Sequence, residues 1–377
     1  MAEKIKNFLI FGSFFVVIVV TFLSFLKIAT SFAPDFSVFY YGAKDLINRQ
    51  NPYQNLRLFT GVGYPPVTLL FFLPLTVIAY PIAQLVWLGL SFLSLLGAVY
   101  LSLKICLGRF SWKLFGIILA LALLAFPTKF TFGMGQSNLV ALFLLLLAFY
   151  LFENKKNILA GISLGLVCFI KPILIFFFFF FFLRRAWTVL STAFFTLIVF
   201  LLISFLIVNP ALYLFYINEV IPPLFNLSGR EIYYNQGTMG FLSRQITDLI
   251  WRRNINFLLS FLLIGATFWI VYKTRKIKDG FALFFPTVLL IDTLSWQHHF
   301  VWLIFPFINV YSHLLKTKLF FLNLILFFSY FLVAINFKDP LLVSERFHSI
   351  FLSHAFFGTL ILWGLCLYIS RRNNENT

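Results

Sequence analysis

The feature that most limits what this chain can form is a series of apolar runs that recurs along its whole length. Runs of about 17–25 residues recur among them, which is the length that a helix needs to cross roughly 30 Å of hydrocarbon. Hydrophobic residues make up 61% of the chain, charged residues make up only 11%, and phenylalanine alone contributes 55 residues. The sequence therefore predicts an all-α, polytopic membrane protein and not a soluble domain with a large core.

We predict about twelve membrane segments in a single membrane-embedded domain, residues 1–377. The segments cover residues 8–28, 80–103, 114–128, 137–152, 158–170, 173–183, 187–208, 256–272, 280–294, 300–314, 319–336 and 348–370. Two of them are short and are joined by a tight turn at Lys171-Pro172. The first run follows Lys4 and Lys6, and its length of about 20 residues predicts a retained helix and not a cleaved signal peptide.

Basic residues gather in the short segments between the apolar runs. With a cytoplasmic N-terminus, Lys155-Lys156, Arg184-Arg185 and the group 273–278 all fall on the cytoplasmic side, in agreement with the positive-inside rule. The net charge of +17 comes from 29 basic and 12 acidic residues. Topology and anionic lipid headgroups explain this charge, so the expected partner is the lipid bilayer and no nucleic acid. We expect a multi-pass protein of the cell (inner or plasma) membrane.

Two longer segments, 29–79 and 209–255, are predicted on the extracytoplasmic side. The first contains Asp35 and is expected to carry interfacial helices, one starting near Asp35 and one after Pro65-Pro66. In the second, apolar and polar residues alternate with helical spacing from 241 to 253, which predicts an amphipathic interfacial helix. Long loops on one side of a membrane enzyme can hold a polar headgroup.

Asp35 is the acidic residue with the clearest chemical use. An inverting glycosyl transfer needs one carboxylate that takes the proton from the attacking hydroxyl, and a phosphate leaving group makes a second carboxylate unnecessary. The structural alternative is that Asp35 only caps a helix or marks its solvated end. Asp45 is the alternative base, but we expect it to face solvent further along the same helix.

Polar and aromatic residues at the outer ends of the apolar runs are candidates for substrate contacts. For a sugar or a diphosphate-like headgroup the candidates are Asn51, Tyr53, Tyr64, Gln136, Asn138, Asn235, Gln236 and Trp296. The structural alternatives are turns fixed by proline at positions 52, 65 and 66, a polar cluster that satisfies Gln136 and Asn138, and an ordinary loop around Asn235-Gln236. The sequence leaves both interpretations open.

Lys171, His298 and His299 are candidates for phosphate contacts. Lys171 lies between two apolar runs, where it either extends toward the interface or stabilises the charge of a leaving phosphate. Adjacent histidines point about 100° apart on a helix, so His298-His299 does not have the i, i+4 spacing favoured for zinc. We therefore expect hydrogen bonds to phosphate or sugar and no metal ion.

No motif for a nucleotide cofactor or a metalloprotease occurs in the sequence, and the three cysteines show no metal or disulfide spacing. No cofactor is expected. The phenylalanine run 176–182 predicts a helix that faces lipid.

Seven motifs in order make the chain resemble glycosyltransferase family 87, whose members are polyprenol-phosphate-mannose-dependent and α-1,2-mannosyltransferase-like. They are Asp35-Phe36 with Tyr40-Tyr41; Asn51-Pro52-Tyr53; Tyr64-Pro65-Pro66 followed by Pro74-Leu75 and Trp87; Gly135-Gln136-Ser137-Asn138; Lys171-Pro172; Asn235-Gln236 with Gly240 and Arg244; and Ser295-Trp296-Gln297-His298-His299. Two positions depart from the family pattern. Arg49-Gln50 replaces a glycine before Asn51, and Gly237 replaces a serine.

The resemblance implies a GT-C fold and an inverting, metal-independent transfer on the extracytoplasmic face. The donor would be a polyprenyl phosphate-linked sugar, with mannose as the default, and the acceptor a glycolipid or another glycan of the cell envelope. Asp35 would be the general base, Tyr40 a substrate contact, and Lys171, Arg244 and His298 or His299 donor-phosphate contacts. Two alternatives remain at this point: a lipid-linked glycan transporter or flippase, and an O-antigen ligase or polymerase-like enzyme.

Overall fold

The computed structural model describes residues 30–54, 62–224, 229–315, 319–338 and 345–375, together with Val19, Lys27 and Ile28. Apart from those three residues, the predicted first span 8–28 lies outside the described part, as do Lys4 and Lys6. The described chain is helical throughout, and its one pair of bridged extended residues is Asn235 and Trp296. The expected all-α class is confirmed for this part of the molecule.

The helices of the first half begin with α2 and end with α10. In order they are α2 (Pro34–Ile47), η1 (Pro52–Gln54), α3 (Pro66–Leu69), η2 (Leu70–Val77), α4 (Tyr80–Leu107), α5 (Trp112–Leu124), α6 (Phe126–Met134), α7 (Asn138–Glu153), α8 (Asn157–Ile170), η3 (Pro172–Phe176), α9 (Phe177–Leu183) and α10 (Trp187–Ile207). Interfacial helices were predicted near Asp35 and after Pro65-Pro66, and α2, α3 and η2 occupy these positions.

The second half runs from α11 to α19. Its helices are α11 (Pro210–Phe215), η4 (Tyr216–Val220), α12 (Ile221–Leu224), α13 (Thr238–Gln245), α14 (Leu249–Lys273), α15 (Ile277–Ile291), η5 (Gln297–Leu303), α16 (Ile304–Leu314), α17 (Phe320–Ala334), α18 (Glu345–Phe351) and α19 (His354–Glu375). The predicted helix over 241–253 is wrong. Asp248 ends that stretch, because its side chain accepts a hydrogen bond from the Trp251 amide and begins α14 as a new helix.

Four helices in the described ranges are long and apolar enough to cross a membrane: α4, α10, α14 and α19. The pair α5 and α6 makes a fifth if the 66° bend between them is counted as one broken span. Residues 114–128 were predicted as one span, and the structure breaks the helix within it, after Leu124, because Pro127 lacks the amide hydrogen that a continuing helix needs. The protein is therefore a multi-pass membrane protein, whereas the number twelve is not confirmed.

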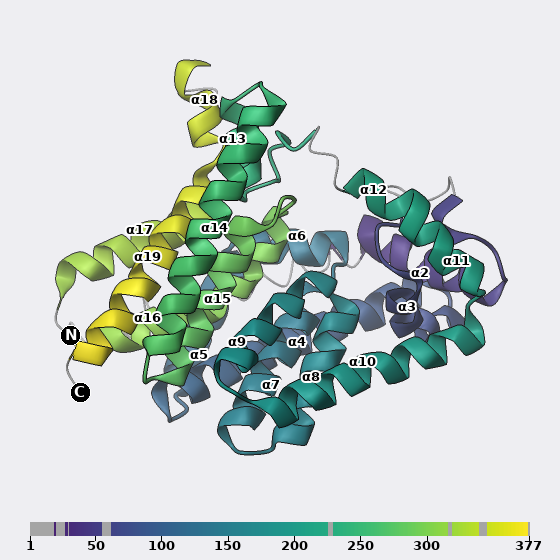
Figure 1. Ribbon diagram of the computed structural model, residues 1–377, viewed down its shortest axis with the longest axis horizontal. Helices are drawn as coiled ribbons and strands as arrows, with labels where there is room; N and C mark the ends of the chain where they lie inside the picture. The colour runs from purple at the N-terminus through teal and green to yellow at the C-terminus, as the bar shows by residue number, and fades with distance from the viewer. Residues whose placement is uncertain are drawn as a thin grey trace.

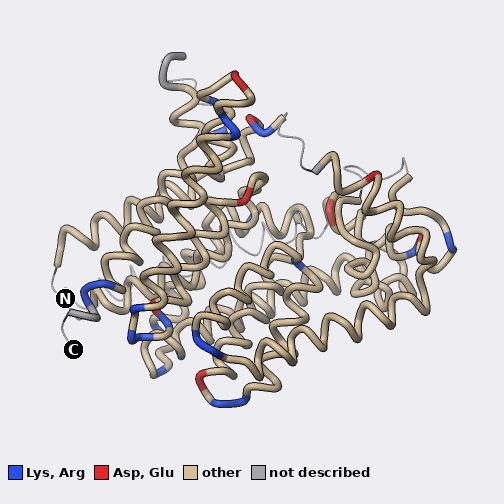
Figure 2. Tube along the Cα trace, in the orientation of Figure 1, with Lys and Arg blue, Asp and Glu red and all other residues tan. Residues whose placement is uncertain are grey.

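Figure 1 shows the helices in two groups. The first group consists of α4, α7, α8 and α10. The second group consists of α14, α15, α17 and α19. Helix α16 packs against members of both groups. Charged residues lie at helix ends and in loops, with uncharged helix between them (Figure 2). This distribution is the one expected for helices that cross hydrocarbon.

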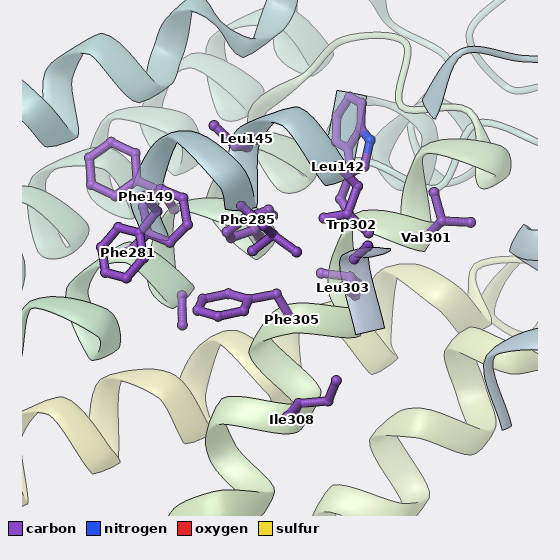
Figure 3. Close-up of a cluster of buried hydrophobic side chains, with 14 of the residues drawn as sticks. Leu142, Leu145, Phe149, Phe281, Phe285, Val301, Trp302, Leu303, Phe305 and Ile308 are labelled. Atoms are coloured by element: carbon purple, nitrogen blue, oxygen red, sulfur yellow. The ribbon is translucent and has the colours of Figure 1, made fainter. Parts of the chain in front are cut away.

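Aromatic packing joins the two groups (Figure 3). The Phe149 ring of α7 stacks on the Phe281 ring of α15, with centroids 4.1 Å apart. Residues Phe177, Phe180 and Phe181 are fully buried, whereas Phe179 and Phe182 are about half exposed. The prediction that run 176–182 faces lipid is therefore wrong for one side of the helix, since that side packs into the core.

A second, smaller core fixes α2 in place. Phe39 stacks on Phe72 of η2 with ring centroids 4.4 Å apart, and Phe36 stacks on Trp87 of α4. The Trp87 indole donates a hydrogen bond to the carbonyl of Gly135, between α6 and α7. Gly135 has a φ of +69°, and a Cβ there would lie 2.5 Å from the Cβ of Phe36. Only glycine permits this close approach, which brings the α6–α7 junction against the start of α2.

Candidate active site

Asp35 lies in the first turn of α2, directly after Pro34. The positive end of the helix dipole favours a carboxylate at this position. The side chain is half-buried, and its Oδ2 accepts a hydrogen bond of 2.6 Å from the amide Nε2 of Gln136. Burial raises the pKa of Asp35 above its ordinary value, while the hydrogen bond from Gln136 and the charge of Lys171 act in the opposite direction. No other described residue donates to this carboxylate, so Oδ1 has no hydrogen-bond partner in the described part of the chain.

A chain of hydrogen bonds connects Asp35 to Lys171 and Tyr64. The Oε1 of Gln136 accepts from Lys171 Nζ at 2.9 Å, and the same Nζ donates to the Tyr64 hydroxyl at 2.6 Å. Four residues predicted for the site therefore meet, although they come from α2, the segment before α3, the α6–α7 junction and the α8–η3 turn. We call this set (Asp35, Gln136, Lys171 and Tyr64) the relay.

Lys171 is only 2% exposed, so its side chain does not extend to the interface as one alternative had it. The turn that carries it is held against α3 by a hydrogen bond from the Thr68 hydroxyl to the Phe169 carbonyl. The buried Lys171 ammonium group donates to a phenol and to an amide. It can donate a further hydrogen bond, and neither partner neutralises its positive charge. Lys171 is thus placed to attract an anion.

The start of η5 forms a second wall near Lys171. His298 and His299 are buried, and the charge of Lys171 acts on both rings. The Trp296 ring stacks on the His298 ring with centroids 6.0 Å apart. The Nδ1 atoms of both histidines have no hydrogen-bond partner among the described residues. A ligand that enters beside Lys171 can supply these partners.

Asn138 supports this wall from α7. Its side-chain Nδ2 donates to the His298 carbonyl at 3.1 Å, a carbonyl that also accepts from the Thr131 hydroxyl at 2.9 Å. The backbone carbonyl of Asn138 accepts from the Trp302 indole at 3.1 Å. The structure therefore engages Asn138 in holding η5, while its neighbour Gln136 belongs to the relay.

Asn235 and Gln236 bond to the backbone of neighbouring segments. Asn235 accepts from the Ser295 amide and donates to the carbonyls of Arg230 and Thr293. Gln236 donates to the carbonyls of Tyr233 and Leu352 and accepts from the Ala355 amide. Both were predicted as substrate contacts. In this structure their amides join the loop before α13 to η5 and α19, which indicates a positioning role.

Arg244 is engaged in the same way. Its Nε donates to the Ser353 hydroxyl at 2.9 Å, and its Nη1 donates to the Asn235 carbonyl at 3.0 Å. Its Nη2 has no partner among the described residues. Most of the guanidinium is therefore used within the protein, so the predicted contact with a donor phosphate depends on Nη2 alone.

Three predicted contacts of the first loop support Tyr64 and α2. The Tyr53 hydroxyl donates to the Tyr64 carbonyl at 2.9 Å, and the Asn51 side chain accepts from the Tyr53 amide. The Tyr40 hydroxyl donates to the Ile78 carbonyl at 2.7 Å from a ring that is buried. Asp45, expected to face solvent, is 8% exposed, so that expectation is wrong.

Two charged residues near the site were not among the predicted contacts. The Asp292 carboxylate acts electrostatically on Lys171 from the end of α15, and the Arg230 guanidinium acts on Asp292. The position of Asp292, just before Ser295-Trp296, was a signal that could have identified it. Arg230 lies in a loop with no motif around it, so the sequence offered no comparable signal.

No three His, Cys, Asp or Glu side chains come together as a metal-binding group in the described ranges. The candidate site brings together the carboxylates of Asp35 and Asp292, the ammonium group of Lys171, amides, a phenol and two imidazoles. Such a set can accept a proton and can stabilise a developing negative charge.

The comparisons with known proteins agree with this chemistry. The model of glycosyltransferase family 87 matches residues 59–295, which is more than half of the chain and includes Tyr64, Gln136 and Lys171. The match begins after Asp35 and ends just before Trp296. No curated protein and no solved structure matches the chain. The chain belongs to glycosyltransferase family 87 and is a membrane glycosyltransferase.

Proposed function

We propose that this glycosyltransferase moves a sugar from a polyprenyl phosphate donor to a hydroxyl group of a lipid-linked or cell-envelope glycan. The transfer inverts the anomeric centre, needs no metal ion and takes place on the extracytoplasmic face. Mannose is the default sugar by family analogy. The observation that carries the proposal is the relay, because it places one open carboxylate oxygen beside a buried cation.

Asp35 is the general base in this proposal. As the acceptor hydroxyl attacks the anomeric carbon, the carboxylate takes its proton, so the new glycosidic bond forms without a charged oxygen. Partial burial and the resulting raised pKa make the carboxylate a stronger base than an aspartate in water. The hydrogen bond from Gln136 fixes one oxygen and leaves the other for the acceptor.

Lys171 and the η5 wall act on the leaving group. When the bond between the anomeric carbon and the phosphate oxygen breaks, the phosphate gains negative charge, which a fixed cation and N–H donors stabilise. Lys171 supplies the cation, and His298 and His299 supply imidazole nitrogens without protein partners among the described residues. Asn235, Gln236, Asn138 and Tyr53 hold these groups in place, with Trp296 as a flat surface for a sugar ring.

The family assignment favours transfer over the two alternatives, a transporter and an O-antigen ligase-like enzyme. Charged residues at helix ends, and not in the middle of the spans, also favour an enzyme with its site at the membrane surface (Figure 2).

The test is sugar transfer by the purified chain in nanodiscs with a panel of short-chain polyprenyl phosphate sugars and a chelator. We expect turnover with at least one donor, unaffected by the chelator, and its loss by about 10³-fold or more in Asp35→Asn. Asp45→Asn is the matched control, since this acid lies on the same helix outside the relay, and it should keep activity. Turnover that persists in Asp35→Asn removes Asp35 as the base; turnover that the chelator abolishes contradicts the metal-free reaction.

A further inference from the structure

A groove lies between the end of α2 and the α10–α11 elbow. Its volume is about 490 Å³. One wall is polar and is formed by Arg49, Gln50 and Asn51, and Asn209 adds to it from the other side. The opposite wall is apolar and includes Phe205 and Phe215. Asn51 bonds to Tyr53, whose hydroxyl bonds to Tyr64 of the relay, and the proposed transfer gives no role to the other groove residues.

Arg49 has an unusual backbone conformation. Its φ is +56°, in the left-handed region where glycine is unstrained and a side chain is not. The turn alone therefore does not explain an arginine. A strained residue that keeps a long cationic side chain points to a use for that side chain.

The polar side chains of the groove carry N–H groups for which no described residue provides an acceptor. The Arg49 side chain makes no hydrogen bond or ion pair with any described residue, and it is exposed. The side-chain oxygens of Asn51 and Asn209 accept from the backbone amides of Tyr53 and Ala211, which leaves both NH₂ groups unused. Among the described residues that line the groove, none is acidic. The occupant must therefore bring negative charge and several acceptor oxygens, which is the chemistry of a phosphate group.

The position of the groove identifies the source of that phosphate. α10 is an apolar candidate span that begins just after Arg184-Arg185 and ends at Ile207, in the groove wall, so the groove lies at the C-terminal end of this span. Apolar side chains beside the donors give the first carbons of a lipid chain a place to pack. A free phosphate ion would leave this apolar wall unused.

We propose that this groove binds the phosphate headgroup of an anionic membrane lipid, with Arg49 as the central cation. Arg49 contacts the phosphate oxygens, the amides of Asn51 and Asn209 add hydrogen bonds, and the apolar wall takes the start of the chain. This inference does not depend on Asp35 or on the identity of the sugar donor.

The experiment titrates the full chain, purified in a neutral detergent, with phosphatidylglycerol and follows both the melting temperature and bound lipid by native mass spectrometry. A ligand that binds the folded state raises the melting temperature. Arg49→Gln should weaken phosphatidylglycerol binding about tenfold or more, because a charge-assisted hydrogen bond is lost. Lys44→Gln is the matched control, since Lys44 is an exposed cation on α2, the helix just before Arg49, and does not line the groove.

Arg49→Gly separates folding from binding. Glycine relieves the positive φ, so the variant without lipid should melt no lower than the native chain, yet phosphatidylglycerol should no longer raise its melting temperature. If Arg49→Gln and Lys44→Gln weakened phosphatidylglycerol binding equally, overall charge would explain the effect and the inference would be overturned. Unchanged binding in Arg49→Gly, or an equal rise in melting temperature with inorganic phosphate alone, would also overturn it.

Discussion

At the scale of single residues, the side chain of Gln136 connects Asp35, the proposed base, to the Lys171 cation. Its amide donates to Asp35 and accepts from Lys171, so the two charged groups are connected without forming a direct ion pair. A direct pair would occupy the carboxylate oxygen that an acceptor needs and the positive charge that a phosphate needs. An amide, which has both a donor and an acceptor, is the side chain that can bridge them.

Replacing Gln136 tests this role. In Gln136→Leu, Asp35 loses a hydrogen bond to its charged form, worth about 1.5–3 kcal/mol, so the transfer rate should fall about 10–150-fold. The lost bond had lowered the pKa of Asp35, so the acid limb of the rate profile should also move to higher pH. Gln84→Leu is the control, because Gln84 is a buried amide that bonds to Ser31 and Ala33. A fall in rate without a shift of the acid limb would assign Gln136 a purely structural role.

The native enzyme itself should show a characteristic pH dependence. A general base works only when it is unprotonated, so the rate falls as pH drops through its pKa. Because burial raises the pKa of Asp35, that fall should occur at a higher pH than for an ordinary aspartate. The measurement is kcat/KM against pH in nanodiscs. An acid limb at or below the ordinary aspartate pKa would argue that Asp35 is not the titrating base.

At the scale of helices, the α6–α7 junction depends on one glycine. In Gly135→Ala, a methyl group would lie 2.5 Å from the Phe36 Cβ at a φ of +69°, so the start of α2 has to move. We expect a loss of about 2 kcal/mol or more of stability, and a loss of activity, because Gln136 follows directly. Gly133→Ala is the matched control. A Cβ at Gly133 meets nothing within 4 Å, so this variant should be neutral or slightly more stable in thermal unfolding.

Some helices could be predicted from the sequence and others could not, for identifiable reasons. Pro34 and Pro66 marked the starts of α2 and α3 because proline fits the first turn of a helix. The amphipathic pattern over 241–253 continued across Asp248, and the pattern does not reveal that this residue caps a new helix. Run 176–182 is apolar on every side, so its sequence cannot tell which side meets protein.

At the scale of the whole molecule, the expected topology makes a direct prediction. The native cysteines Cys106, Cys168 and Cys366 are buried, so a membrane-impermeant thiol reagent should label single introduced cysteines selectively. Glu219→Cys, predicted outside, should react in intact cells, and Lys156→Cys should react only after the cells are opened. The reverse pattern would place the relay on the cytoplasmic face.

The sequence was sufficient to predict the four residues of the relay, but not the contacts that each candidate residue makes. The order of motifs identified Asp35, Tyr64, Gln136 and Lys171, and the structure brings these four together. The same motifs identified Asn235, whose amide is used by backbone groups distant in sequence. A sequence shows that an amide is present but not which partner takes its hydrogen bonds, since that depends on how the helices pack.

The residues of the relay and of the η5 wall are far apart in the sequence, and this has a consequence for biosynthesis. Asp35 leaves the ribosome early, Lys171 only after nearly half of the chain, and His298 and His299 when most of it has been made. A nascent chain therefore has no complete centre until η5 has been delivered to the membrane beside α6 and α7. If these residues carry the proposed transfer, activity is acquired only near the end of insertion, and we expect a product truncated before η5 to be inactive.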